Sequence, residues 1–332
     1  MTSDRADALL RKFADLHVLV LGDLMLDEFV WGKVTRISPE APVPVVEVQS
    51  ASFYPGGAAN VVRNLVPFTR RTSAVGAVGA DAAGAQLRDL LRAEGTHVSG
   101  IIDFGDRGTA HKMRIIGRQQ QMVRVDRETV GPLLPADREK LVAYLREEIS
   151  RCDAVIIEDY GKGVVDQALV DTVVAEARKH GKIVTVDLNP KNPLDWNDAT
   201  AVKPNRPEAL ACAGIDDDGT LGCVERAAAI LLERWKTDYL LVTLGEDGML
   251  LYDRKAPAGS RPYHTPTRAQ KVFDVSGAGD TAIALFTLAL AAGGTGIEAA
   301  EMSNHASGIV VGKLGTATLT PDELRESFQA KE

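Results

Sequence analysis

Short apolar runs alternate along the chain with helix-length amphipathic stretches, and this alternation constrains the fold more than any other feature of the sequence. Each apolar run is continuous and rich in β-branched residues, which is typical of parallel strands covered on both faces. We therefore expect an α/β fold with a doubly wound, mainly parallel sheet and helices on both faces, and a ligand site beyond the carboxyl ends of the strands. The runs are Val18–Leu21, Ala154–Ile157, Ile183–Asp187 and Tyr239–Thr243, and the expected helices cover Leu134–Ser150, Asp166–His180 and Leu221–Lys236.

Two segments depart from this rhythm, at about residues 27–48 and 111–126. Apolar and polar residues alternate in Glu28–Arg36 and again in Val43–Val48. Such alternation indicates antiparallel strands, which would lie outside the main sheet. We expect the two segments to form one small β-sheet lid, as insertions into a single domain that covers residues 1–332.

Charge and composition narrow the possible partners. The chain has 38 Lys and Arg against 46 Asp and Glu, a formal net charge of −8, whereas nucleic-acid binding depends on a basic surface. The 6 histidines form neither H-E-x-x-H nor a Cys/His cluster of zinc spacing, which argues against a zinc hydrolase. The N-terminus lacks the apolar segment of a secretory signal, and the longest apolar run, Ala282–Ala292, is too short to span a bilayer. The 3 cysteines form no C-x-x-C pair, which suits a reducing compartment. From these features together we expect a cytoplasmic protein that binds neither nucleic acid nor membrane.

The most informative stretch is Asp274–Thr281, which precedes an apolar helix. Backbone amides of Gly277, Ala278 and Gly279 at the start of that helix would form an anion hole for phosphate. Asp280 stands at the same place, where an ionised carboxylate could act as the general base for a hydroxyl nucleophile. The alternative interpretation is a glycine-rich turn with an acidic N-cap.

Two other nucleotide-binding motifs do not fit. Gly277, Gly279 and Ala282 match the dinucleotide fingerprint G-x-G-x-x-A, but residues 293–297, before the acidic Glu298, do not form a strand. An NAD oxidoreductase is therefore disfavoured. The chain also contains no Walker A sequence, so a P-loop NTPase is excluded.

Polar residues that follow the later strands are candidates for binding a nucleotide and its metal. Asn205 and Glu208 would share one face of a helix and could hold hydrated Mg²⁺ through water, since Mg²⁺ keeps most of its waters. A capping box explains the same spacing equally well. The remaining candidates are Asn189 and Lys191 after the third strand, and Thr243, Gly245 and Gly248 after the fourth.

A second group of residues suits a sugar substrate. Asp23 and Asp27 follow the first strand, and Gly56, Gly57 and Asn60 open a helix where a polyol could approach. Lys112, Arg114 and Arg118 would lie on one face of a lid strand and could hold an anionic substrate, although a solvated edge strand is the alternative. Lys162, after the second strand, is a further candidate for an anion.

Three of these motifs occur in the order found in the ribokinase-like (PfkB) carbohydrate kinases, which the chain resembles over nearly its whole length. They are the G-G-x-x-x-N element at Gly56–Asn60, the N-x-x-E element at Asn205–Glu208 and the signature Asp274–Asp280. The resemblance implies a ribokinase fold with a β-lid, ATP with Mg²⁺ as phosphoryl donor, Asp280 as catalytic base and an anion hole at Gly277–Gly279. Because lids of this kind often dimerise, we expect a homodimer through the lid.

A narrower resemblance links residues 22–48, 54–65, 114–128, 159–164, 187–191 and 243–249 to the D-glycero-β-D-manno-heptose 7-phosphate kinases of lipopolysaccharide core biosynthesis. These kinases phosphorylate the anomeric C1 hydroxyl to give the 1,7-bisphosphate. Many carry a C-terminal nucleotidyltransferase with H-x-G-H; this chain has no such motif and resembles the stand-alone kinase form. Glu158 departs from the serine expected at its position. The alternatives are a kinase for fructose or a hexose phosphate, and a non-catalytic regulator that binds a nucleotide or sugar.

Overall fold

The computed structural model describes residues 1–105, 107–117, 120–257, 259–269, 272–313 and 315–329. Its centre is a nine-stranded sheet in the order β13-β12-β11-β10-β9-β8-β1-β4-β5. From β11 to β5 all neighbours are parallel, and β12 and β13 add an antiparallel edge. This confirms the predicted mainly parallel sheet. The strands are β1 (His17–Gly22), β4 (Arg71–Val78), β5 (His97–Asp103), β8 (Ala154–Glu158), β9 (Ile183–Asp187), β10 (Ala201–Val202), β11 (Tyr239–Thr243), β12 (Met249–Asp253) and β13 (Tyr263–Thr265).

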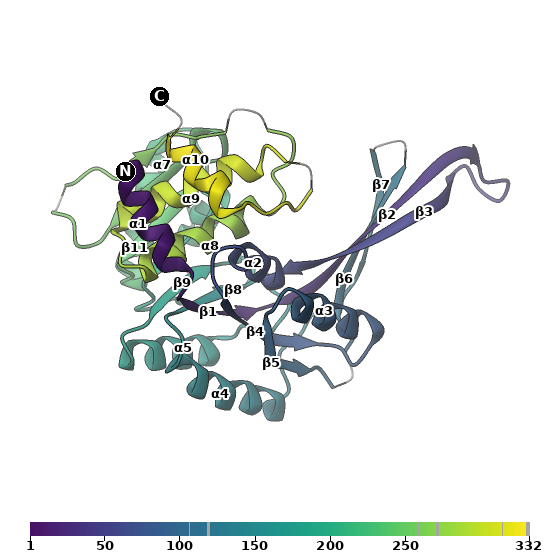
Figure 1. Cartoon of the computed structure of the whole chain (residues 1–332), viewed down its shortest axis with the longest axis horizontal. Coiled ribbons are helices and arrows are strands. Elements are labelled where there is room, and N and C mark those ends of the chain that lie inside the picture. Colours follow the sequence, from purple (N-terminus) through teal and green to yellow (C-terminus); the bar gives the residue numbers. More distant parts are fainter. Residues whose placement is uncertain (106, 118–119, 258, 270–271, 314, 330–332) are drawn as a thin grey trace.

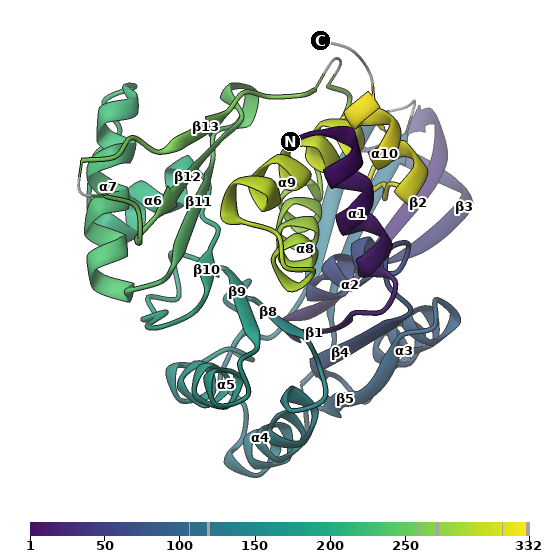
Figure 2. The ribbon, with the colours of Figure 1, turned by 60° about the vertical axis from the view of Figure 1, so that its left-hand side comes forward.

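Helices cover both faces of this sheet (Figures 1 and 2). One face packs against α1 (Ser3–Phe13), α2 (Ala58–Leu65), α3 (Ala82–Ala93), α8 (Ala278–Ala291), α9 (Gly296–Val310) and α10 (Pro321–Gln329). The other packs against α4 (Pro135–Ile149), α5 (Gln167–Lys179), α6 (Arg206–Ala213) and α7 (Leu221–Trp235). Within β1, Val18 and Val20 belong to the first core, and Leu19 and Leu21 to the second. The strand is continuously apolar because each of its faces is buried. No helix in the described part of the chain is long and apolar enough to cross a membrane.

The lid is a separate four-stranded sheet, which projects from the body in Figure 1. Its strands are β2 (Leu24–Ile37), β3 (Pro44–Gly57), β6 (Ala110–Gly117) and β7 (Gln120–Arg127), in the order β3-β2-β6-β7. The two hairpins β2–β3 and β6–β7 are antiparallel as predicted. The pairing between them is parallel, so the prediction of purely antiparallel strands was wrong at this junction. The long connection through α2, β4, α3 and β5 makes this possible, because parallel neighbours need a crossover of a dozen or more residues.

The first hairpin of the lid also extends further toward the body than the alternation of apolar and polar residues predicted. Leu24 pairs with Gly57 at the base of the first hairpin, and Leu24, Met25 and Leu26 are all buried. Buried residues on both faces of a strand give no polar alternation, which explains why this part of the hairpin was missed. Gly57 has φ +58°, and a Cβ atom there would lie 2.5 Å from the carbonyl oxygen of Asp23. The body and the lid are therefore joined through a close backbone contact.

Candidate active site

A polar cavity of about 610 Å³ opens where the carboxyl ends of β8 and β9 face the N-terminus of α8. Parallel α/β sheets bind their ligands at this edge, because strand ends and helix N-termini converge there. The cavity is lined by Glu158, Asp159, Tyr160, Asp187, Leu188, Asn189, Lys203, Asn205, Arg206, Pro207, Glu208, Thr243, Leu244, Gly245, Val275, Gly279 and Asp280.

Asp280 lies in the first turn of α8 and is only 7% exposed. The amide of Asn60 donates to its Oδ2 at 2.5 Å, and the hydroxyl of Tyr160 donates to its Oδ1 at 3.0 Å. Burial raises the pKa of Asp280 to about 6, and these two hydrogen bonds oppose that rise. The carboxylate is thus held in place from both sides and is a stronger base than an ordinary aspartate.

The residues of the predicted anion hole lie in the turn before α8 and at its start. Gly277 has φ +79°, and a Cβ atom there would lie 2.9 Å from the amide nitrogen of Asn60. The N–H of Ala278 donates to the carbonyl of Val275 at 3.2 Å, so this group already has a partner. Gly279 itself lines the polar cavity. The anion hole is therefore narrower than three equivalent amides.

A buried ion pair lies beside Asp280. The ammonium of Lys203, just after β10, lies 2.7 Å from Oδ2 of Asp187 at the end of β9. Oxygens of Glu158, Asp187 and Asp280 all lie within 4.8 Å of one another. Sequence reasoning assigned no role to Tyr160, Asp187 or Lys203. Their common signal is position, because each lies at or just beyond the carboxyl end of a parallel strand.

Asn205 and Glu208 form a capping box at the start of α6. Oδ1 of Asn205 accepts from the N–H of Glu208 at 2.9 Å, and Oε2 of Glu208 accepts from the N–H of Asn205 at 2.8 Å. Both residues also line the polar cavity, where burial and the charge of Asp187 raise the pKa of Glu208. The capping role and a water-mediated role toward Mg²⁺ are compatible, because Glu208 keeps its second carboxylate oxygen and Oδ1 of Asn205 keeps a second lone pair.

A second, more apolar cavity of about 520 Å³ adjoins the first. Thr243, Gly245, Val275 and Gly279 line both cavities, and Gly248 lines the second. Its remaining walls include Met249, Val272, Ala278, Ala282 and Val311. An apolar cavity that opens onto a polar cavity beside a helix N-terminus suits a nucleotide. The base would lie in the apolar cavity and the phosphates in the polar cavity.

Two of the other predicted nucleotide residues occupy the loop after β9. Oδ1 of Asn189 accepts from the N–H of Lys191 at 3.0 Å, which closes a tight turn. Asn189 lines the polar cavity, whereas Lys191 is exposed and lines neither cavity.

Asp23 is buried at the junction of β1 and β2. Its Oδ2 accepts from the N–H groups of Tyr160 and Lys162, each at 2.9 Å, and its Oδ1 accepts from that of Val164 at 3.2 Å. The carboxylate thus anchors the loop that carries Tyr160. Gly56 lies against Asp27 so closely that a Cβ atom would be 2.4 Å from its Oδ2.

Lys112 and Arg114 lie on the lid face that carries Asp27, as their spacing predicted. Nη1 of Arg114 lies 2.5 Å from Oδ1 of Asp27, and the ammonium of Lys112 lies 5.9 Å from the ring centre of Tyr160. Burial lowers the pKa of Lys112. Lys162 pairs with Glu128 at 2.7 Å. The prediction for Arg118 falls outside the described residues.

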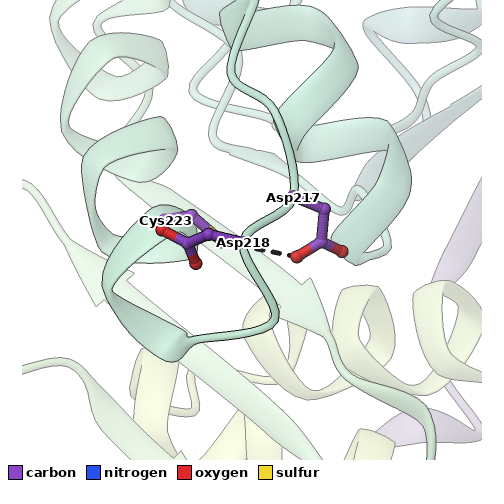
Figure 3. A group of neighbouring side chains, drawn as sticks. All are labelled: Asp217, Asp218 and Cys223. Carbon is purple, nitrogen blue, oxygen red and sulfur yellow. Dashed lines mark hydrogen bonds between the residues drawn. The ribbon is translucent and has the colours of Figure 1, made fainter.

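A second acidic group lies between α6 and α7 (Figure 3). Both oxygens of Asp217 bind the guanidinium of Arg206, and both oxygens of Asp218 are used by Thr220 and Arg226. Cys223 donates to Asp217 at 3.6 Å and to the carbonyl of Thr220 at 3.0 Å. These contacts organise the start of α7.

Comparisons with known proteins identify the family of the chain. Residues 15–323 match the model of the pfkB family carbohydrate kinases. The bifunctional protein HldE of Desulfatibacillum aliphaticivorans is 41% identical over 319 residues, which cover 96% of this chain and 64% of that protein. The same protein of Caulobacter vibrioides is 42% identical over 314 residues, 95% of this chain and 64% of that protein. The chain therefore spans less than two thirds of the length of these relatives.

Solved structures share the fold at low sequence identity. Arabidopsis thaliana ribokinase, complexed with ribose and ATP, superposes with a TM-score of 0.71 at 19% identity, over 96% of this chain and 100% of that one. Phosphofructokinase-2 from Escherichia coli, in complex with substrates and products, superposes with a TM-score of 0.74 at 20% identity, over 95% and 98% of the two chains. At these identities the likeness concerns the fold, which is ribokinase-like.

Proposed function

The chain belongs to the pfkB family of carbohydrate kinases, and on that premise we propose that it transfers a phosphoryl group from ATP to the C1 hydroxyl of D-glycero-β-D-manno-heptose 7-phosphate. The product would be the 1,7-bisphosphate, a precursor for the lipopolysaccharide core. In this proposal the reaction takes place in the cytoplasm. The sugar is supported by the heptose-kinase-like stretches of the sequence and by identity of about 40% to proteins named HldE.

The observation that carries this proposal is the position of Asp280. Its carboxylate is buried at the N-terminus of α8, where the polar cavity adjoins the apolar one. With a pKa of about 6, Asp280 is largely ionised at pH 7 and still has appreciable affinity for a proton. In our proposal Asp280 takes the proton of the sugar hydroxyl as its oxygen attacks the terminal phosphoryl group of ATP.

Positive groups around Asp280 would receive the transferred phosphoryl group. The predicted anion hole at Gly277–Gly279 presents the positive end of the α8 dipole. Lys203 places an ammonium beside the same turn, since a Cβ atom on Gly279 would lie 3.5 Å from its Nζ. The ATP phosphates would therefore face fixed positive charge on one side and the reacting hydroxyl on the other.

The base of ATP fits the apolar cavity, with Thr243, Gly245 and Gly248 along its wall. Asn205 and Glu208 would hold Mg²⁺ through water. Asn189 lines the cavity proposed for the phosphates, and Lys191 lies outside it in the same loop. The bound ion would neutralise charge on the phosphate oxygens.

The sugar would lie between Asp280 and the lid. Oδ1 of Asn60 is buried without a hydrogen-bond partner in the described part of the chain, so it can accept a bond from a sugar hydroxyl. Asp27, Gly56 and Gly57 lie at the base of the lid, and Asp23 holds the loop of Tyr160. The 7-phosphate would bind Lys112 and Arg114, with Lys162 and Arg118 as further candidates.

A substrate panel tests the proposal. Purified protein with ATP and Mg²⁺ is given heptose 7-phosphate, fructose 6-phosphate, fructose or ribose, and ADP release is measured. We expect the highest kcat/KM for heptose 7-phosphate, and a loss of kcat of about 10²–10⁴-fold in Asp280→Asn, because that variant keeps the shape but not the base. A preference for fructose or fructose 6-phosphate would assign another sugar kinase, and no turnover of any sugar would indicate a binding protein.

A further inference from the structure

The polar cavity holds more negative than positive charge. Glu158, Asp187 and Asp280 bring three carboxyl groups to within 4.8 Å of one another, and Lys203 is the ammonium paired with them, through Asp187. If all three carboxyl groups were ionised, the cluster would carry an excess of negative charge where the phosphates of ATP must bind. Such an arrangement is costly, because buried like charges repel strongly.

The three carboxyl groups differ in their partners. Asp280 receives hydrogen bonds from Asn60 and Tyr160, and Asp187 receives the ammonium of Lys203. Glu158 is only 2% exposed, and its Oε2 has no partner among the described residues. It is the member of the cluster whose negative charge nothing directly neutralises.

The strands around Glu158 explain this isolation. It ends β8, between Gly22 of β1 and Asp187 of β9 in the sheet register. Burial and the neighbouring Asp187 and Asp280 raise its pKa well above the usual range, and the charge of Lys203 only partly opposes this. In its protonated form the carboxyl group can share a hydrogen bond with Asp187.

A divalent cation would balance the same charges, but the geometry favours a proton. Lys203 already provides a cation 2.7 Å from Asp187, so a metal ion among these oxygens would face an ammonium at close range. Asp280 also needs a free lone pair if it is to act as a base. A proton on Glu158 leaves two carboxylates and one ammonium, and it uses the carboxyl group as a donor.

We propose that Glu158 is a positioning residue that stays protonated in the resting enzyme and donates a hydrogen bond to Asp187, which fixes the Asp187–Lys203 pair beside Asp280. The proposal rests on the proposed role of Asp280 as the base. Glu158 does not touch the reacting atoms. It contributes a neutral donor at a point where an ionised side chain would repel ATP.

Infrared difference spectroscopy tests the protonation without any turnover. The spectrum of the full-length protein minus that of Glu158→Gln should show the carbonyl band of a protonated carboxylic acid at pH 7. The matched control is Glu233→Gln, a substitution of an exposed glutamate on α7, which should show no such band. The absence of the band in the Glu158 difference spectrum overturns the proposal. If Glu158→Gln does not fold, titration of the wild-type spectrum still tests the proposal, because the absence of any acid band above pH 7 would overturn it.

Kinetics supply the second readout. Glutamine mimics the protonated acid, so kcat/KM of Glu158→Gln at pH 7 should stay within about threefold of the wild type. Its activity should extend further into the alkaline range than that of the wild type, which loses activity as Glu158 ionises. A loss of more than about tenfold at pH 7, accompanied by a higher Mg²⁺ requirement, would show that the residue works as a carboxylate and overturn the proposal. If heptose 7-phosphate is not the substrate, the infrared result still stands, so the two proposals can fail separately.

Discussion

At the scale of single residues, the hydroxyl of Tyr160 controls how readily Asp280 accepts a proton. Its hydrogen bond to Oδ1, 3.0 Å long, lowers the pKa of Asp280, against the rise caused by burial. A base works only when ionised, so activity must fall as the pH drops through that pKa. Tyr160→Phe removes the hydrogen bond and should raise the pKa above about 6.

We therefore expect the acid limb of the kcat/KM profile of Tyr160→Phe to move to higher pH by about one to two units, since a hydrogen bond to a charged group contributes about 1.5–3 kcal/mol. Activity near pH 8 should change much less than activity near pH 6. The matched control is Tyr252→Phe, because the hydroxyl of Tyr252 is buried without a partner among the described residues. An unchanged acid limb in Tyr160→Phe would show that the hydroxyl does not affect the base.

Sequence reasoning singled out Asp280 and Asn60 as candidate site residues, but it assigned no role to Tyr160 or Lys203. Asp280 and Asn60 belong to glycine-containing motifs that indicate a helix start near a ligand. Tyr160 and Lys203 follow strands in ordinary-looking segments, and their roles depend on which strand ends become neighbours in the sheet. The capping box of Asn205 and Glu208 was one of two interpretations, and only three-dimensional geometry shows that it forms.

At the scale of elements, the first turn of α6 combines a cap with a proposed metal function. Glu208→Gln keeps an oxygen that can accept from the N–H of Asn205, so the free energy of unfolding should change by no more than about 1 kcal/mol. The Mg²⁺ concentration needed for half-maximal activity should rise, because a carboxylate is lost from the cavity. A Mg²⁺ titration and thermal unfolding measure the two effects.

Glu298→Gln is the control for this substitution, because Glu298 completes a similar capping box with Thr295 at the start of α9. It lines neither the polar nor the apolar cavity, so its Mg²⁺ dependence should match the wild type. A loss of stability in Glu208→Gln with unchanged Mg²⁺ dependence would show that Glu208 caps α6 and does not contribute to Mg²⁺ binding.

The lid strand β6 carries the proposed site for the substrate phosphate. A charge-assisted contact contributes about 1.5–3 kcal/mol, so Lys112→Ala and Arg114→Ala should each raise KM for heptose 7-phosphate by about 10- to 150-fold. The KM for ATP should be largely unchanged, because its proposed cavities lie in the body. Lys33→Ala, at an exposed position of β2, is the control. If sugar KM stays the same in both variants, the phosphate site must be sought at Lys162 and Lys191.

The elements that could be predicted are those buried on both faces. The four predicted strands match β1, β8, β9 and β11 to within about one residue, because burial on both faces produces an unbroken apolar run. No such run marks β4, where Ser73 and Gly76 interrupt the pattern, or the short edge strand β13. The parallel pairing of β2 with β6 has no sequence signal, since alternation is the same for either strand direction.

At the scale of the whole molecule, the lid exposes apolar side chains on the face opposite Lys112 and Arg114. Val123 is 48% exposed and Val125 is 38% exposed, and they pair with Ile115 and Met113 of β6. Large exposed apolar surfaces of this kind are typical of interfaces. We expect a homodimer in which this face of the lid meets a second copy.

Val123→Lys should shift the protein toward a monomer in analytical ultracentrifugation at micromolar concentration, because a buried unpaired ammonium is costly. Ile230→Lys, at an exposed position of α7, should leave the association state unchanged. A wild-type protein that sediments as a monomer would refute the interface.

The direct passage from β1 to β2 has a mechanical consequence. A single residue, Asp23, separates the two strands, and its carboxylate also holds the loop of Tyr160. The lid is thus attached directly to β1 of the body, and the residue at this joint also holds the loop whose Tyr160 hydroxyl donates to Asp280. The covalent chain and the three hydrogen bonds accepted by the Asp23 carboxylate therefore fix this joint relative to the loop of Tyr160. We therefore expect the joint to lose little conformational freedom when the proposed sugar binds, which leaves more of the binding energy available for the proposed reaction.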